Sequence, residues 1–129
     1  GYDYDVDTRI KTSDNEQWFE SHDAEVSEDG LYTMFDNTKG SPSRVLEFKI
    51  DKTQKVLTDF KAYTYKSYSG RYMGSVKKLK EGIYLVSWGS YRSNGTPNIG
   101  IYDFKNNKVI FEMKFEKTAY NVYRVYGLI

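Results

Sequence analysis

The chain has 129 residues, a formal net charge of +1 and no cysteine. The length suits a single domain, and the 19 basic residues are balanced by 18 acidic ones with no concentrated basic face, which argues against nucleic-acid binding. No apolar run is long enough to span a membrane, and the lack of cysteine excludes a disulfide framework and a thiolate metal site. Aromatic residues make up 17% of the chain, a content that favours β-strands.

Residues 1–20 form a mixed, acidic N-terminal segment. Ser13 and Glu16 have the spacing of a capping box, which predicts one helical turn through Trp18 and Phe19. From His22 onward the pattern is one of short strands, and residues 21–129 form the main region.

The first half of this region predicts four strands. A tight turn at Glu28-Asp29-Gly30 precedes a strand over 31–35, and residues 37–43 form a loop. Alternating apolar residues then predict a half-buried strand, with Leu46, Phe48 and Ile50 on one face. After a turn at 51–54, the fourth strand is expected to bury Val56, Thr58, Phe60 and Ala62.

The second half repeats this order. A strand that includes Leu79 leads to a turn at Lys80-Glu81-Gly82, a strand over 83–88 and a loop over 90–97. A strand through Gly100, Tyr102 and Phe104 follows, and Asn106-Asn107 predicts a hairpin turn because asparagine tolerates positive φ. The last strand is expected to bury Val109, Phe111, Met113 and Phe115.

The two halves therefore read as copies of one unit, over about 21–66 and 72–117, followed by a closing strand within 119–129. Tyr84 follows Tyr32 by 52 residues and Tyr102 follows Phe48 by 54, close to the ~50-residue blade repeat of some β-propellers. Propellers contain roughly four to eight blades. We expect an all-β fold of two four-stranded antiparallel blades with flanking strands, which is an incomplete propeller.

Several stretches carry a family resemblance. In the first copy they are His22-Asp23-Ala24-Glu25, Asp29-Gly30, Phe35-Asp36-Asn37 and Ser43-Arg44-Val45-Leu46-Glu47-Phe48. In the second they are Gly74-Ser75-Val76-Lys77-Lys78-Leu79, Gly82 and Ser87-Trp88-Gly89, with Tyr123-Arg124-Val125-Tyr126 near the end. Together they resemble the arylsulfotransferase family of bacterial arylsulfate sulfotransferases. The resemblance covers residues 18–127 and corresponds to the C-terminal part of a typical member.

The resemblance implies a six-bladed propeller that moves a sulfuryl group from an aryl sulfate to a phenol without a nucleotide donor. It also implies a periplasmic or secreted protein. In the family a histidine takes the sulfuryl group, and further histidines and an arginine line the central channel. This chain has one histidine. Either the others lie in blades outside this chain, or the chain is a non-catalytic relative.

His22 and Arg44 are the candidate catalytic residues, and Asn37 is the candidate substrate-binding residue. A neutral imidazole is a nucleophile at neutral pH, a guanidinium offers fixed charged donors to sulfuryl oxygens, and the Asn37 amide is a further donor. Each has a structural alternative. His22 could be an ordinary surface residue, Arg44 could pair with Asp36 or Glu47, and Asn37 could bond to loop backbone. Asp23, next to His22, would lie on the opposite face of a regular strand.

We expect no cofactor and no metal site, because one histidine without cysteine does not make a usual zinc site. The expected partners are an aryl sulfate and a phenol, with a homo-oligomer or further blades completing the assembly. On this interpretation the chain is inactive alone. The alternative is a non-enzymatic, tyrosine-rich β-sheet module that binds a ligand or a partner, because sheet scaffolds host many functions.

Overall fold

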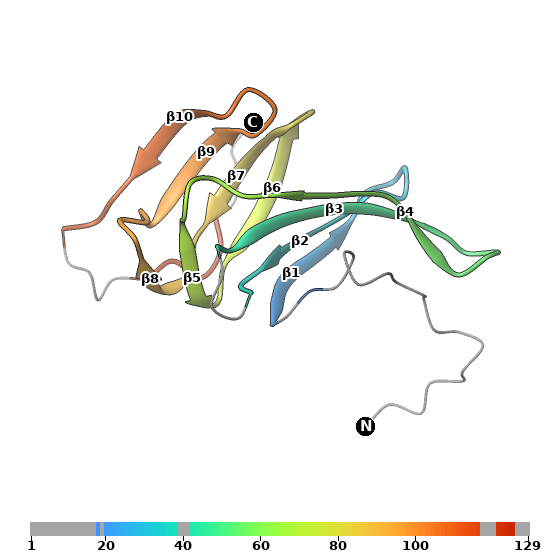
Figure 1. Cartoon of the computed structure of the whole chain (residues 1–129), viewed down its shortest axis with the longest axis horizontal. Helices are drawn as coiled ribbons and strands as arrows, with labels where there is room; N and C mark the ends of the chain where they lie inside the picture. Colours follow the sequence, from blue (N-terminus) through green and yellow to red (C-terminus); the bar gives the residue numbers. More distant parts are fainter. Residues whose placement is uncertain (1–17, 19, 39–41, 117–120, 126–129) are drawn as a thin grey trace.

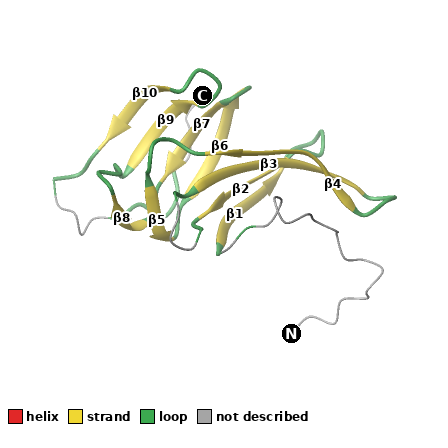
Figure 2. Cartoon of the chain, viewed as in Figure 1, coloured by secondary structure: helices red, strands yellow, loops and turns green. Residues whose placement is uncertain are grey.

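A computed structural model describes residues 18, 20–38, 42–116 and 121–125. Within these residues the chain forms ten strands and no helix (Figures 1 and 2). The strands are β1 (Ser21–Val26), β2 (Tyr32–Asp36), β3 (Arg44–Asp51), β4 (Val56–Tyr63), β5 (Ser69–Tyr72), β6 (Ser75–Lys80), β7 (Ile83–Ser87), β8 (Ser90–Ser93), β9 (Ile99–Asp103) and β10 (Lys108–Met113). No helix in this part of the chain is long and apolar enough to cross a bilayer.

The strands form two four-stranded antiparallel sheets. The first has the order β1-β2-β3-β4, and the second has the order β10-β9-β7-β6. The two sheets have equivalent registers, because Tyr32 lies opposite Phe48 in the first and Tyr84 lies opposite Tyr102 in the second. The expected all-β class with four-stranded antiparallel sheets is thus confirmed. That these sheets are blades of a propeller stays a prediction.

The predicted turns join the strands. Gly30 and Gly82 have φ of 82° and 77°, and Asn107 has φ of 53°, all in the left-handed region that glycine and asparagine adopt most readily. At the β3–β4 turn, Asp51 Oδ1 accepts hydrogen bonds from the backbone N–H groups of Thr53 and Gln54, both at 2.9 Å.

A third, two-stranded sheet was not predicted. β5 and β8 pair with each other at one end of the molecule (Figure 1), so the expected loop over 90–97 is wrong where β8 lies. Their sequences, Ser-Gly-Arg-Tyr and Ser-Tyr-Arg-Ser, lack the apolar alternation that marks a strand. Gly70 permits the close approach of β5 to the backbone between β7 and β8, because a Cβ there would lie 1.6 Å from the Trp88 carbonyl oxygen.

The main core lies between the two large sheets. Its buried side chains include Phe35 and Val45 from the first sheet and Val76, Tyr84 and Tyr102 from the second. A smaller apolar cluster covers the other face of the first sheet and contains Met34, Leu46, Phe48 and Leu57, with Trp18, Tyr32, Ile50 and Phe60 against it.

Two strand faces differ from the predicted ones because β-bulges interrupt the alternation. In β4 the register shifts opposite Glu47–Lys49, where Asp59 has φ of 53°, and Leu57 replaces Val56 and Thr58 on the packed face. The expected buried face of the last strand is also wrong. The register of β10 shifts between Val109 and Phe111, and every residue of β10 is exposed.

Some expectations fall outside the described residues. The capping box and Phe19 of the predicted helical turn belong to this group, as do residues 117–120 and 126–129 around the predicted closing strand. Of that strand, Val122 forms an isolated β-bridge with Gly89.

Candidate functional site

The three candidate residues lie at one end of the first sheet, in two neighbouring rows. His22 lies opposite Phe35, and Phe35 lies opposite Val45, which places His22 on the face that packs on the second sheet. Arg44 lies opposite Asp36, one residue along β2, and therefore on the other face. The structure thus places β2 between His22 and Arg44 and their side chains on opposite faces of the sheet.

His22 occupies an irregular part of β1. It is partly buried, and its imidazole makes no hydrogen bond within the described part of the chain. The register of β1 shifts between His22 and Glu25, and Asp23 has φ of 56°. The bulge turns the Asp23 carboxylate to the second sheet, where it accepts a hydrogen bond from the Val76 N–H at 3.3 Å.

Asp23 also binds the C-terminal segment. Its carboxylate pairs with the Arg124 guanidinium, and only 4% of the Asp23 side chain is exposed. Burial and the neighbouring Glu25 raise the pKa of Asp23, while Arg124 opposes this rise. Asp23 therefore connects β1, β6 and the C-terminal segment, and its carboxylate is engaged with groups other than His22.

Arg44 forms an ion pair with a fully buried acid. Its Nε and Nη2 atoms donate to Asp36 Oδ2 at 3.0 Å and 2.5 Å, and the Asp36 side chain is 0% exposed. The other Asp36 oxygen accepts the Thr38 N–H at 3.1 Å. Asp36, one of the two acids proposed from sequence as structural partners, therefore holds the Arg44 guanidinium.

Asn37 fastens the β2–β3 loop to β5. Its Nδ2 group donates to the carbonyl oxygens of Gly70 and Met73 at 2.7 Å and 2.9 Å, which uses both amide hydrogens. Ser43 Oγ accepts the Gly70 N–H at 3.0 Å. Asn37 Oδ1 is the one buried side-chain polar atom without a hydrogen bond among the described residues.

A pocket of about 490 Å³ opens beside this junction. The β2–β3 loop forms one wall. The other wall is the two-stranded sheet of β5 and β8 with the residues next to it, here called the β5–β8 arm (residues 67–72 and 90–94). The lining residues are mostly polar: Glu20, Asn37, Thr38, Pro42, Ser67, Ser69, Gly70, Arg71, Tyr91, Ser93 and Asn94. Asn37 is the one candidate residue in this lining. Sequence reasoning missed Arg71 and Tyr91, because the arm that carries them has no recognisable strand pattern.

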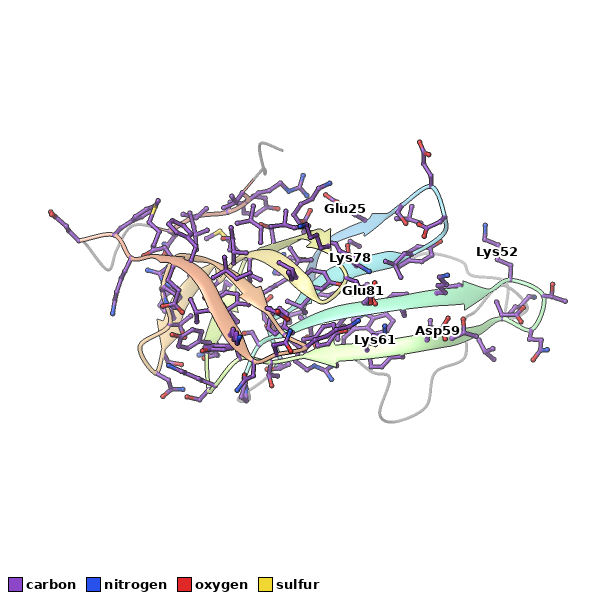
Figure 3. The ribbon with its side chains drawn as sticks, turned by 90° about the horizontal axis from the view of Figure 1, so that it is seen from above. Glu25, Lys52, Asp59, Lys61, Lys78 and Glu81 are labelled. Carbon is purple, nitrogen blue, oxygen red and sulfur yellow. The ribbon has the colours of Figure 1, made fainter. Side chains whose placement is uncertain are left out.

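A second charged cluster joins the two sheets through buried Glu47 of β3. Its carboxylate accepts hydrogen bonds from Lys78 Nζ at 2.6 Å and from the Tyr84 hydroxyl. Burial alone would raise the pKa of Glu47, but these bonds outweigh it and hold the pKa below its usual value. Lys61, Lys78 and Glu81 lie together in Figure 3, and Lys78, with a smaller contribution from Lys61, lowers the pKa of Glu81 to about 2.

The described residues hold no group of three or more histidine, cysteine, aspartate or glutamate side chains placed to bind a metal. The candidate site therefore consists of the His22 imidazole, the buried Arg44–Asp36 ion pair, the hydrogen-bonded Asn37 amide and a polar pocket. Antiparallel β-sheets carry all of these groups.

The arylsulfotransferase (ASST) family model matches residues 5–126. The match spans nearly the whole chain, so the chain belongs to the arylsulfotransferase family, which confirms the resemblance drawn from its motifs. Neither the curated proteins nor the solved structures contain a significant match.

Proposed function

We propose that this chain is the C-terminal part of an arylsulfotransferase-like β-propeller enzyme that transfers a sulfuryl group from an aryl sulfate to a phenol. The observation that carries the proposal is the family match over residues 5–126. Two four-stranded sheets are fewer than the roughly four to eight blades of a propeller. We therefore expect no turnover from the chain alone, and an exported location as the family resemblance implies.

His22 is the proposed carrier of the sulfuryl group. One imidazole nitrogen attacks sulfur, an S–N bond forms, and the S–O bond to the aryl group breaks to release a phenolate. The acceptor phenol then gives its proton to the released phenolate, its oxygen attacks sulfur, and the S–N bond breaks to return neutral His22. The lack of a hydrogen bond to the imidazole within the described residues supports this role.

Arg44 and Asn37 have supporting roles in this proposal. Positioning and charge stabilisation dominate this kind of group transfer, as they do in phosphoryl transfer. Asp36 fixes the Arg44 guanidinium, and Asn37 fixes the loop at the same end of the sheet. Arg44 and Asn37 therefore act by holding the end of β2 and its loop in place, because the Arg44 side chain lies on the opposite face of the sheet from His22 and its charge is paired with Asp36.

The experiment is a transfer assay with 4-nitrophenyl sulfate as donor and phenol as acceptor. It compares the full gene product that contains these residues with its His22→Ala variant, and uses Lys52→Gln as a control. Lys52 lies at the distant β3–β4 turn (Figure 3). The proposal predicts transfer by the wild type and by Lys52→Gln, and none by His22→Ala. Full transfer by His22→Ala would refute the role of His22.

The alternative is a non-enzymatic binding module. The observation that favours it is Tyr91, which lines the polar pocket and is 76% exposed. A module would bind a ligand there while the full gene product turns over no aryl sulfate. Binding and turnover measured on the same sample separate the two functions.

A further inference from the structure

We propose that the pocket between the β2–β3 loop and the β5–β8 arm binds an aromatic anion, with its ring against Tyr91 and its charged group on Arg71. Nothing in the family match assigns a role to either residue. The choice of an aryl sulfate as the anion rests on the proposed function, whereas the pocket and its chemistry do not.

Tyr91 provides the aromatic surface. It lines the pocket, is 76% exposed, and meets Tyr72 edge to face with ring centroids 5.4 Å apart. Its backbone φ is 50°, a conformation that is rare for a bulky side chain. Active sites and ligand clamps are among the places where such conformations occur. An open ring held in this way by the fold is a natural partner for a second aromatic ring, which prefers offset or edge contacts.

Arg71 provides the charge. Within the described residues its guanidinium forms no ion pair and no hydrogen bond, and it lies over the Tyr72 ring with Cζ 5.5 Å from the ring centroid. The other described arginines are engaged: Arg44 with Asp36, Arg92 with Gly89 and Asn121, and Arg124 with Asp23. The Arg71 guanidinium can therefore donate two parallel hydrogen bonds to a sulfate group.

The remaining lining sets the orientation of the ligand. Ser69, Ser93 and Asn94 surround the arm side of the pocket with hydroxyl and amide groups. Glu20 lines the pocket as well and makes no ion pair in the described part of the chain. Its carboxylate repels an anion, so the sulfate end is directed to Arg71 and away from Glu20.

The pocket is also joined to the candidate catalytic end of the sheet. Asn37 lines it while its amide holds Gly70 and Met73 on either side of Arg71 and Tyr72. Glu20 precedes His22 by two residues. A ligand in this pocket therefore contacts the loop that carries Asn37 and the residue that immediately precedes β1.

The test is a titration of the isotope-labelled 129-residue chain, followed by amide chemical shifts. The probe is 4-nitrophenyl sulfate, and the comparison ligands are the neutral 4-nitroanisole, methyl sulfate and inorganic sulfate. We expect saturable shifts at Arg71, Tyr91 and Asn94 with the aryl sulfate and about tenfold weaker binding of each comparison ligand, because each lacks the ring or the sulfate group.

Arg71→Gln and Tyr91→Leu should each weaken binding of the aryl sulfate about tenfold. The matched controls are Lys52→Gln, which removes the same charge far from the pocket, and Tyr123→Leu, which removes another exposed tyrosine. Both controls should bind like the wild type. Because Arg71 and Tyr91 are exposed, their variants should fold, and the dispersion of their amide spectra will verify this.

The proposal is overturned if no saturable shifts appear at the pocket, if inorganic sulfate binds as tightly as the aryl sulfate, or if the control variants lose as much affinity as Arg71→Gln. The readout is independent of sulfuryl transfer. If the full gene product has no transferase activity, the proposed function is refuted. The titration would still show whether the pocket binds an aromatic anion.

Discussion

Arg44 illustrates how one side chain can match a catalytic motif and also hold the fold together. Asp36 is fully buried and accepts two hydrogen bonds from the Arg44 guanidinium. Removal of one partner from a buried ion pair leaves a charge that solvent cannot reach. Loss of activity in an Arg44 variant would therefore reflect structure as well as chemistry.

We predict that Arg44→Leu lowers the free energy of unfolding by about 3 kcal/mol, the cost typical of breaking a buried pair from one side. The double variant Arg44→Leu/Asp36→Leu should recover part of the lost free energy of unfolding, because it also removes the buried Asp36 carboxylate that would otherwise have no ion-pair partner. Urea denaturation of the three proteins measures both effects. A single variant as stable as the wild type would contradict the structural role of Arg44.

The candidate residues could be named from sequence, but their grouping could not. The sequence motifs shared with the arylsulfotransferase family contain three residues whose side chains suit the chemistry, which are His22, Arg44 and Asn37. Whether two of them share a face depends on strand register, which places His22 opposite Phe35 and Arg44 opposite Asp36. Arg71 and Tyr91 become neighbours of Asn37 only through long-range pairing of β5 with β8.

At the scale of elements, Glu47 connects β3 to the second sheet. Lys78 and Tyr84 both donate to its buried carboxylate. These bonds lower its pKa in the folded protein relative to the unfolded chain. Stabilisation by the ionised form is therefore present above the ordinary pKa of 4.5 and is lost as the pH falls through the folded pKa.

We predict that the wild type loses stability as the pH falls below 4.5, and that Glu47→Gln shows a shallower dependence over the same interval. Glutamine keeps the shape of the side chain and removes the titration. The measurement is the thermal midpoint as a function of pH, with Glu28→Gln, at an exposed position in the β1–β2 turn, as the control. Parallel curves for wild type and Glu47→Gln would contradict the account.

Strand prediction succeeded where alternation was continuous and failed where it was not. In the two large sheets, β3 follows alternating apolar residues, β7 follows a short apolar run, and glycine or asparagine turns mark where β2, β7 and β10 begin. β5 and β8 lack that alternation. In β4 and β10 the bulges moved side chains to the other face, and nothing in an apolar sequence marks where an extra residue will enter a ladder.

At the scale of the molecule, β10 leaves apolar side chains uncovered. It pairs with β9 on one side, and among the described residues no strand pairs with its other edge. Ile110, Phe111 and Met113 are 56%, 43% and 42% exposed. An apolar edge strand of this kind pairs readily with another chain or with a further blade.

We predict that the chain self-associates at micromolar concentrations and that Ile110→Lys weakens this association, because a charge on an edge strand opposes strand pairing. Light scattering across a concentration series measures the mean mass. Tyr123→Lys, which charges an exposed residue outside β10, should associate like the wild type. A wild type that stays monomeric throughout the series would refute the prediction.

The family match and the two open sheets lead to one central claim, that His22 carries a sulfuryl group within a larger propeller. The most direct measurement is mass spectrometry of the full gene product after brief exposure to 4-nitrophenyl sulfate without acceptor. We predict one added sulfuryl group on the peptide that contains His22, and its loss when phenol is supplied. Sulfuryl transfer to phenol with no modification at His22, or with full rate in His22→Ala, would contradict it.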